Sequence, residues 1–373
     1  MKLSFFALFL ALAGLAFGQP QQTPAAPTPE VHADRRVTFR IAAPKATEVS
    51  FVCDWQGAPQ KMEKGADGVW SLTVGPLAPS SYIYSFNVDG IAMADPINPR
   101  IKLRARTSAS IVVVPADGGP ALDEIRDVPH GNIDMNFHKS VVLDGDTRSF
   151  WVYTPPGYAQ NSAQRYPVLY LFHGTNDRPN GWLDVGNVNV IADNLIAEKK
   201  MAPMLIVMPY GHALPYGQRG GQGGRTNTTA FSDYVIKEVI PAVEGKYRVA
   251  PGRENRALSG FSMGAEQSLH IFFHNLELFS ALGALAPSGY RAMETQHPAL
   301  LADPKATNAK IALLWIGCGR QDPGHFNGSQ QLVDVLAKSQ ITHTWRPVEG
   351  AHNHAFIRGQ LVEFLPLLFR AGK

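Results

Sequence analysis

Two different patterns of apolar residues divide the chain. Between about residues 31 and 115, short runs alternate apolar and polar side chains, and turn residues such as Asp89 and Gly90 separate them. Alternation with a period of two is typical of strands with one buried face. The runs lie at residues 37–41, 48–52, 69–74, 82–88 and 110–114. Their spacing predicts an antiparallel, immunoglobulin-like β-sandwich.

The second pattern begins near residue 135. Runs at 141–143 and 148–153 predict an opening antiparallel pair of strands. Continuous apolar runs then indicate strands buried on both faces; they lie at 168–172, 204–208 and 311–316. Amphipathic segments fall between them, at 190–199, 231–247, 265–276 and 329–339. Strands that alternate with helices predict an α/β domain, a doubly wound and mostly parallel sheet with helices on both faces.

The N-terminus precedes both domains and has the features of a signal peptide. Lys2 is followed by an apolar stretch at residues 3–17 and by small residues near 18. A bilayer-spanning helix needs about 20 residues, so we expect cleavage rather than anchoring. The expected organisation is a signal peptide (1–18), a Pro-rich linker (19–30), the sandwich (31–115), a linker (116–134) and the α/β domain (135–373). A secreted or periplasmic protein, not bound to membrane after processing, is therefore predicted.

Charge and cysteine content narrow the choice of partners. The net charge is +3 with 17% charged residues and no basic cluster, which argues against nucleic acid or an anionic membrane surface. Cys53 and Cys318 are the only cysteines, and both lie in strand-like apolar runs. We expect two buried free thiols rather than a disulfide, a nucleophile or a metal ligand. No phosphate-binding motif is present, and no cofactor is expected.

A G-x-S-x-G motif at residues 260–264 carries the strongest chemical signal. A strand-like run at 256–259 precedes it, and a helix-like segment follows it. A nucleophile elbow requires this strand–turn–helix arrangement, which exposes the serine at the end of a strand. Ser262 is thus the predicted nucleophile; a Gly/Ser turn without chemistry is the alternative.

An acid and a histidine follow in the order that this arrangement requires. Asp322 comes directly after a buried strand, and His352 lies 30 residues later, before the last helix-like segment. We expect His352 to accept the proton of Ser262, and Asp322 to orient the imidazole. His354 is the alternative base.

The loop after the strand at 168–172 is expected to help bind the oxyanion. Backbone N–H groups of Thr175 and Met263 are the predicted donors, while His173 is expected to brace the loop. Metal-dependent hydrolysis through His352, His354 and Asp322 is the competing chemistry. No H-E-x-x-H motif is present and the histidines lack i, i+4 spacing, so we predict no metal.

At these residues the chain resembles carbohydrate esterase family 1, which contains feruloyl esterases, acetyl xylan esterases and esterase-D-like enzymes. The matching stretches are residues 153–158, 166–174, 189–196, 260–264 and 350–352. The resemblance implies an α/β-hydrolase that cleaves feruloyl esters of plant cell-wall polysaccharide such as arabinoxylan, through an acyl-enzyme. It also implies His352 rather than His354 as the base and Asp322 as the acid.

The N-terminal region resembles early-set β-sandwich modules related to glycogen-binding domains. The similar stretches are residues 51–55, 67–71 and 84–90. This resemblance implies contact with glycan, with Trp55 and Trp70 as candidates. The alternative is that Trp70 belongs to the core and that the module only packs on the catalytic domain.

Three alternatives stay open at this point. Acetyl xylan and siderophore esters are rival substrates, because fold-level similarity does not settle the acyl group. A glycan-binding protein with a degenerate hydrolase scaffold is the rival without catalysis. The Gly-rich stretch at 217–224 is either a mobile lip that admits polymer-linked esters or an ordinary surface loop.

Overall fold

The computed structural model describes residues 27–117, 121–218, 226–290 and 292–370. The predicted signal peptide and most of the predicted Pro-rich linker and Gly-rich stretch lie outside the described residues. Within the described part of the chain, no helix is both long and apolar enough to cross a membrane.

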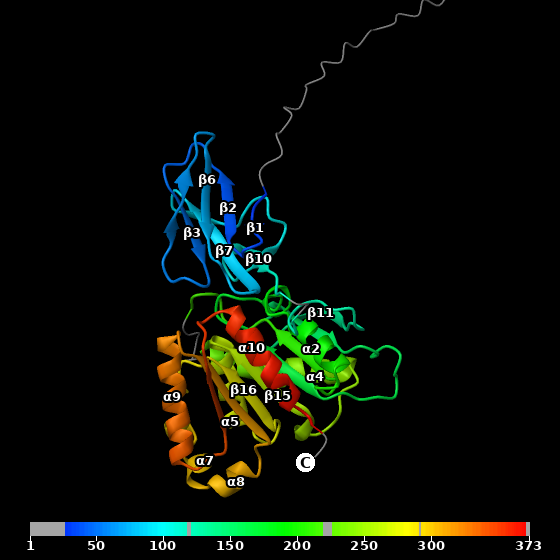
Figure 1. The fold of residues 1–373 in the computed structure, drawn as a ribbon. Helices are drawn as coiled ribbons and strands as arrows, with labels where there is room; N and C mark the ends of the chain where they lie inside the picture. The colour runs from blue at the N-terminus through cyan, green and yellow to red at the C-terminus, as the bar shows by residue number, and fades with distance from the viewer. Residues whose placement is uncertain (1–26, 118–120, 219–225, 291, 371–373) are drawn as a thin grey trace, which may run out of the picture.

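The N-terminal region is a sandwich of two antiparallel sheets (Figure 1). The first sheet has the order β1 (Glu30–Val31), β2 (Val37–Ala42), β6 (Val69–Val74), β5 (Glu63–Lys64). The second has the order β4 (Gln60–Lys61), β3 (Val49–Cys53), β7 (Ser80–Val88), β10 (Ser108–Val114), β9 (Ile101–Leu103), with β8 (Ile91–Met93) paired to β7. The apolar positions of the alternating runs face inward, and Phe39, Phe51 and Tyr84 fill the core between the sheets. Each run predicted from the alternation is a strand here.

The C-terminal region is built on an eight-stranded sheet. Its order is β11 (Asn132–Lys139), β12 (Thr147–Thr154), β14 (Leu205–Pro209), β13 (Val168–Phe172), β15 (Arg256–Phe261), β16 (Ala281–Leu285), β17 (Leu313–Gly319), β18 (Thr344–Val348). β11, β12 and β14 are joined by antiparallel pairing, whereas all pairs from β14 to β18 are parallel. This is the predicted α/β-hydrolase fold.

Helices cover both faces of this sheet. They are α1 (Gly181–Asp184), α2 (Val188–Ala197), α3 (Asn227–Tyr234), α4 (Ile240–Lys246), α5 (Met263–His274), α6 (Ala292–Gln296), α7 (Pro298–Ala302), α8 (Pro304–Asn308), α9 (Pro323–Lys338) and α10 (His354–Phe364), with short 3-10 turns at Arg253–Asn255 and Leu365–Leu367. Along β13, Val168, Tyr170 and Phe172 belong to one core cluster, and Leu169 and Leu171 to the other. Because both faces of the strand are buried, its sequence is continuously apolar.

Two predicted elements differ from those observed. Residues 141–143 form a turn rather than a strand, and the first strand is β11, which begins before the predicted domain boundary at 135. β11 is an edge strand in which Ile133, Met135 and Phe137 alternate with polar residues, a period-two pattern that the prediction did not include. The helix predicted at 231–247 begins earlier and contains a π-helical segment at Val235–Val239. Pro241 lies one turn further on and has no N–H for the regular helical ladder.

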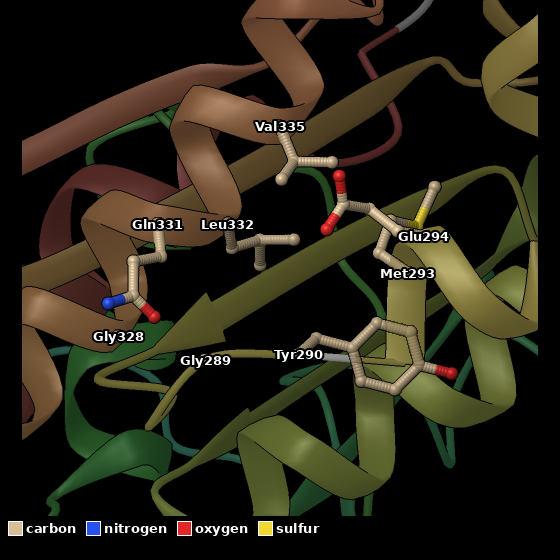
Figure 2. A pocket seen from close by; sticks show the side chains of 8 residues that line it. All are labelled: Gly289, Tyr290, Met293, Glu294, Gly328, Gln331, Leu332 and Val335. Atoms are coloured by element: carbon tan, nitrogen blue, oxygen red, sulfur yellow. The ribbon is translucent and has the colours of Figure 1, made fainter.

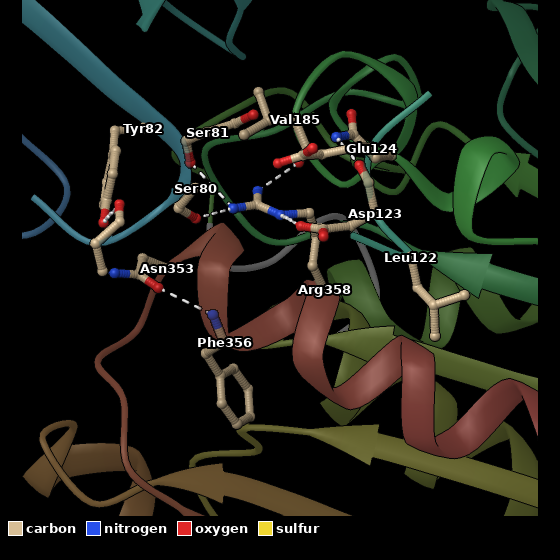
Figure 3. Close-up of polar contacts among 12 residues, drawn as sticks. Ser80, Ser81, Tyr82, Leu122, Asp123, Glu124, Val185, Asn353, Phe356 and Arg358 are labelled. Atoms are coloured by element: carbon tan, nitrogen blue, oxygen red, sulfur yellow. Dashed lines mark hydrogen bonds and ion pairs between the residues drawn. The ribbon is translucent and has the colours of Figure 1, made fainter. Parts of the chain in front are cut away.

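The sandwich packs on the end of the α/β domain where α10 begins (Figure 1). Arg358 of α10 is 2% exposed and holds several segments together (Figure 3). It donates to the carboxylate of Asp123 at 2.8 Å, to the carbonyl of Val185 at 2.7 Å and to the carbonyl of Ser81 at 3.1 Å. It also donates to the hydroxyl of Ser80. The two domains therefore share one buried polar network.

Both cysteines are free, as predicted. Cys318 is buried in β17, but Cys53 is only partly buried at the end of β3, because its strand lies near the rim of the sandwich.

Candidate active site

Ser262 lies at a strained turn between β15 and α5. Its backbone has φ 54° and ψ −116°, a conformation that costs free energy for a residue with a Cβ. Close packing on both sides explains the two glycines of the motif. A Cβ at Gly260 or Gly264 would lie less than 3.0 Å from backbone atoms, those of Gly264 and Phe172 respectively. The Ser262 N–H donates to the carbonyl of Leu285 at 2.9 Å. The turn thus holds the serine at the carboxyl end of the sheet, as a nucleophile elbow requires.

Asp322 and His352 come together from two loops at the same end of the sheet. Nδ1 of His352 donates to Oδ2 of Asp322 at 2.5 Å. The loops are joined by the Gln321 N–H, which donates to the carbonyl of Gly350 at 3.0 Å. Asp322 is 8% exposed and caps the N-terminus of α9. With its proton on Nδ1, His352 leaves Nε2 unprotonated, which is the form a general base needs.

His352 also lies against the nucleophile turn. Its ring stacks on Phe261, the residue before Ser262, with centroids 4.3 Å apart. Burial, and next to it the neighbouring His325, lower the pKa of His352, while the Asp322 charge opposes them. The ring is therefore held in its neutral form at neutral pH.

His325 is a neighbour that the sequence patterns did not reveal. Its Nδ1 donates to Oδ1 of Asp322 at 2.9 Å, and its ring stacks on His352 with centroids 3.9 Å apart and planes 16° from parallel. The only signal in the sequence was its position three residues after Asp322, in the first turn of a helix that Asp322 caps.

The possible ligand atoms of Asp322, His325 and His352 lie within 4.8 Å of one another, which is close enough to ask whether the three residues could bind one metal ion. An imidazole binds zinc through a lone pair in the ring plane at about 2.0–2.1 Å. Two nearly parallel rings stacked 3.9 Å apart hold their lone pairs in separate, nearly parallel planes, so both cannot point straight at one ion. Both Nδ1 atoms already contact carboxylate oxygens at hydrogen-bond distance. The geometry fits a hydrogen-bonded triad and not a metal centre.

His354, the alternative base, faces away from this cluster. It is 6% exposed, and its Nε2 lies 3.3 Å from Oδ2 of Asp177. Burial, followed by the charge of Lys102, lowers the pKa of His354 to about 4. Lys102 of the sandwich, 3% exposed, makes an ion pair with the other oxygen of Asp177. Although burial opposes it, the contacts with His354 and Lys102 hold the pKa of Asp177 well below its usual range. His354 is thus part of an interdomain network.

The predicted oxyanion donors lie on loops after neighbouring strands, β13 and β15. Met263 begins α5, and Thr175 is exposed, with its carbonyl accepting from Nε2 of His212 at 2.7 Å. His173 is buried and braces the loop: its Nδ1 donates to the carbonyl of Gly174, and its Nε2 accepts from the Gly211 N–H at 2.8 Å. The donor role of Thr175 and Met263 remains a prediction.

The two tryptophans of the sandwich differ in exposure. Trp70 is 4% exposed in the core, and its indole N–H donates to the carbonyl of Ala43. The prediction of glycan contact is wrong for Trp70, because a sugar cannot reach the faces of a buried ring. Trp55 is partly buried and packs edge-on against Tyr82. Both rings line a hollow of about 550 Å³ that also borders Ala351 and Asn353, on either side of His352.

A second cavity, of about 260 Å³, lies between α6 and α9 (Figure 2). Its lining includes the apolar side chains of Tyr290, Met293, Leu332 and Val335 and the polar side chains of Glu294 and Gln331. Ser262, Asp322 and His352 do not line it, so it does not define the acyl pocket.

Comparisons with known proteins show the family of this chain. The family model "Esterase" matches residues 140–368, which include the elbow, the acid and the histidine. The chain belongs to this esterase family. The matched region is the α/β domain, and a solved ferulic acid esterase of carbohydrate esterase family 1 is among the similar structures.

One curated protein and two solved structures show how far the similarity extends along this esterase. It is 30% identical over 320 residues to an endo-1,4-beta-xylanase/feruloyl esterase of Xylanibacter ruminicola, covering 84% of this chain and 42% of that protein. A ferulic acid esterase of Anaeromyces mucronatus shares 26% identity at a TM-score of 0.54, over 66% of this chain and 93% of that one. The enterobactin esterase of Shigella flexneri has a TM-score of 0.66 at 18% identity, over 89% of this chain and 92% of that one, which shows a common fold. The chain spans less than half the length of the curated relatives it matches.

Proposed function

We propose that this esterase removes hydroxycinnamoyl groups, above all feruloyl groups, from plant cell-wall polysaccharide. The observation that carries the proposal is the hydrogen-bonded Asp322–His352 pair stacked against the strained Ser262 turn. The substrate class is supported by the similarity to a xylanase/feruloyl esterase, which covers 84% of this chain and so extends beyond the catalytic domain.

In the proposed mechanism, Ser262 Oγ attacks the ester carbonyl while His352 Nε2 accepts its proton. The N–H groups of Met263 and Thr175 donate to the oxyanion of the tetrahedral intermediate; losing one such donor typically lowers kcat by roughly 100- to 1,000-fold. The intermediate collapses as the imidazolium returns the proton to the departing sugar hydroxyl. Water then attacks the acyl-enzyme, again with His352 as base, and releases the free acid.

We also propose that Trp55, rather than Trp70, contacts the glycan. The hollow beside Trp55 and Tyr82 lies next to the His352 loop, where the sugar part of a bound ester could extend. Trp55 is only partly buried and lines this hollow, so the exposed part of its ring can pack against a sugar.

The test compares hydrolysis of methyl ferulate, an aryl acetate and a feruloylated arabinoxylan oligosaccharide by wild type and Ser262→Ala. Turnover of ferulate by wild type and its loss in Ser262→Ala is the expected result. Turnover of acetate alone would assign a deacetylase. No turnover of any ester, combined with retention on arabinoxylan, would instead favour a glycan-binding scaffold.

A siderophore ester is the second candidate substrate. The specific observation is that the enterobactin esterase fold covers both domains of this chain. Including a catecholate trilactone in the same assay separates the two candidates. Export is proposed as well, and mass determination of the mature protein from its native host checks the predicted cleavage after residue 18.

A further inference from the structure

The carboxylate of Asp322 holds two histidines, of which the proposed triad uses one. Oδ2 accepts from His352 and Oδ1 accepts from His325, at 2.5 and 2.9 Å. Each oxygen therefore has its own imidazole donor. The bond to His325 fixes the rotation of the carboxylate, since Oδ1 cannot leave its donor without moving Oδ2 away from His352.

Two aromatic rings also enclose the imidazole of His352. Phe261 stacks on it at 4.3 Å and His325 at 3.9 Å. Two rings cannot occupy the same face of a third at these distances, so they lie on opposite faces. Asp322 fixes the imidazole within its plane, and the two rings prevent it from tilting out of that plane. Such restraint keeps Nε2 directed at one point, which is what proton transfer to and from a serine needs.

The two histidines are coupled through charge as well as contact. Three carboxylates act on the pair: Asp322 itself, Glu266 of α5, which attracts His325, and Asp177, which attracts His352. The side chain of His325 is 28% exposed, so solvent reaches it. A proton on His325 places a positive charge 3.9 Å from the ring that must remain neutral as a base.

We propose that His325 is a positioning residue of the catalytic triad: it fixes the Asp322 carboxylate and one face of His352, and when protonated it repels a proton from His352. This inference rests on the proposed triad. It assigns His325 no contact with substrate, so KM is expected to stay the same when His325 is replaced.

The test uses hydrolysis of an aryl acetate, because that assay does not depend on the feruloyl assignment. His325→Phe keeps a stacked ring but loses the bond to Asp322 and the charge. His325→Gln keeps a donor but loses the ring and the charge. His343→Gln is the matched control, since its Nδ1 donates to the backbone carbonyl of Ile341 and, among the described residues, it has no bond to Asp322 or His352.

We expect the acid limb of kcat/KM to move to higher pH in both His325 variants, by about half to one pH unit, because each removes the repelling charge. At the pH plateau kcat should fall roughly 10-fold in His325→Phe, which loses the hydrogen bond to a charged group, and by under about threefold in His325→Gln. The control should keep the wild-type profile. A residue that only supported the fold would lower the melting temperature and leave the pH profile in place.

Three results would overturn the inference: wild-type acid limbs in both variants, kcat within about twofold of wild type in His325→Phe, or activity that chelator abolishes and zinc restores. If His325→Phe does not fold, the acid limb of His325→Gln decides. Ser262→Ala and His352→Ala distinguish a failure of the proposed triad from a failure of the proposed role of His325. If those variants keep activity, the proposed triad fails; if they lose it while the His325 variants behave as wild type, only the role of His325 fails.

Discussion

Lys102→Met tests whether the sandwich supports the catalytic loops. Lys102 projects from β9 into the α/β domain, where it pairs with Asp177 in the loop that carries Thr175. The adjacent Asn176 accepts from the Ala105 N–H at 3.0 Å, so the same loop also touches the sandwich backbone. Methionine fills a similar volume but leaves Asp177 without its buried cation.

The expected loss is large, because removing one partner of a buried ion pair leaves an uncompensated charge. Such changes typically cost about 3–5 kcal/mol. His354 can offset part of this cost by taking up a proton, since its Nε2 lies 3.3 Å from Asp177. We therefore expect a loss of about 3 kcal/mol at pH 8 and a smaller loss at pH 6, measured by urea unfolding.

The direction of this pH dependence follows from His354. In wild type its pKa is lowered to about 4, below its ordinary value of about 6.5, so folding releases a proton between these values and stability rises with pH there. Burial, the main cause, still lowers the pKa of His354 in the variant, but the charge of Lys102 is gone, so this pKa should rise from about 4. The variant should therefore lose less stability than the wild type as the pH falls below about 6.5, which makes the loss caused by Lys102→Met smaller at low pH.

Lys45→Met, at an exposed position on the same sandwich, is the control for loss of a lysine. Lys102→Met/Asp177→Asn removes both charges and should recover most of the stability. A pH-independent loss in Lys102→Met, or a loss no larger than that of Lys45→Met, would refute the reasoning. Ester turnover measured on the same samples shows whether the loops depend on the network.

Two further predictions follow from the site. Gly264→Ala should prevent folding or abolish turnover, because its Cβ would lie less than 3.0 Å from the carbonyl carbon and oxygen of Phe172. Gly359→Ala is the matched control: its Cβ would meet nothing within 4 Å inside α10, so it should raise stability by up to about 1 kcal/mol. Soluble yield and thermal melts compare the two variants, and normal turnover by Gly264→Ala would contradict the close packing. The acid limb of kcat/KM for an aryl acetate should have its midpoint below about pH 6.5, because burial lowers the pKa of His352; a midpoint above this value would mean that another group limits the rate.

The sequence predicted those parts of the molecule that depend on local pattern. Most strands of both domains follow from apolar periodicity, and the elbow follows from two glycines at fixed distances from Ser262. The strands β16 and β18 were not among the predicted runs. The strand β11 was missed although Ile133, Met135 and Phe137 alternate with polar residues, the same period-two pattern that marked the sandwich. His325 and the Lys102–Asp177–His354 network were missed because their partners are brought together only by packing of loops and domains. The identity of Trp70 as a core residue depends likewise on which face of β6 meets the second sheet.

The bonds of Arg358 restrict how the two domains can evolve and how they can be exchanged by engineering. One guanidinium on the last helix of the catalytic domain is bonded to β7 of the sandwich, to the segment joining the domains and to the loop before α2. Exchanging the sandwich for one from another enzyme would remove two of its acceptors, Ser80 and Ser81, unless the new module supplied a hydroxyl and a carbonyl at the same places. The two domains are therefore expected to have diverged as a unit, and a chimera should transplant the interface along with the module.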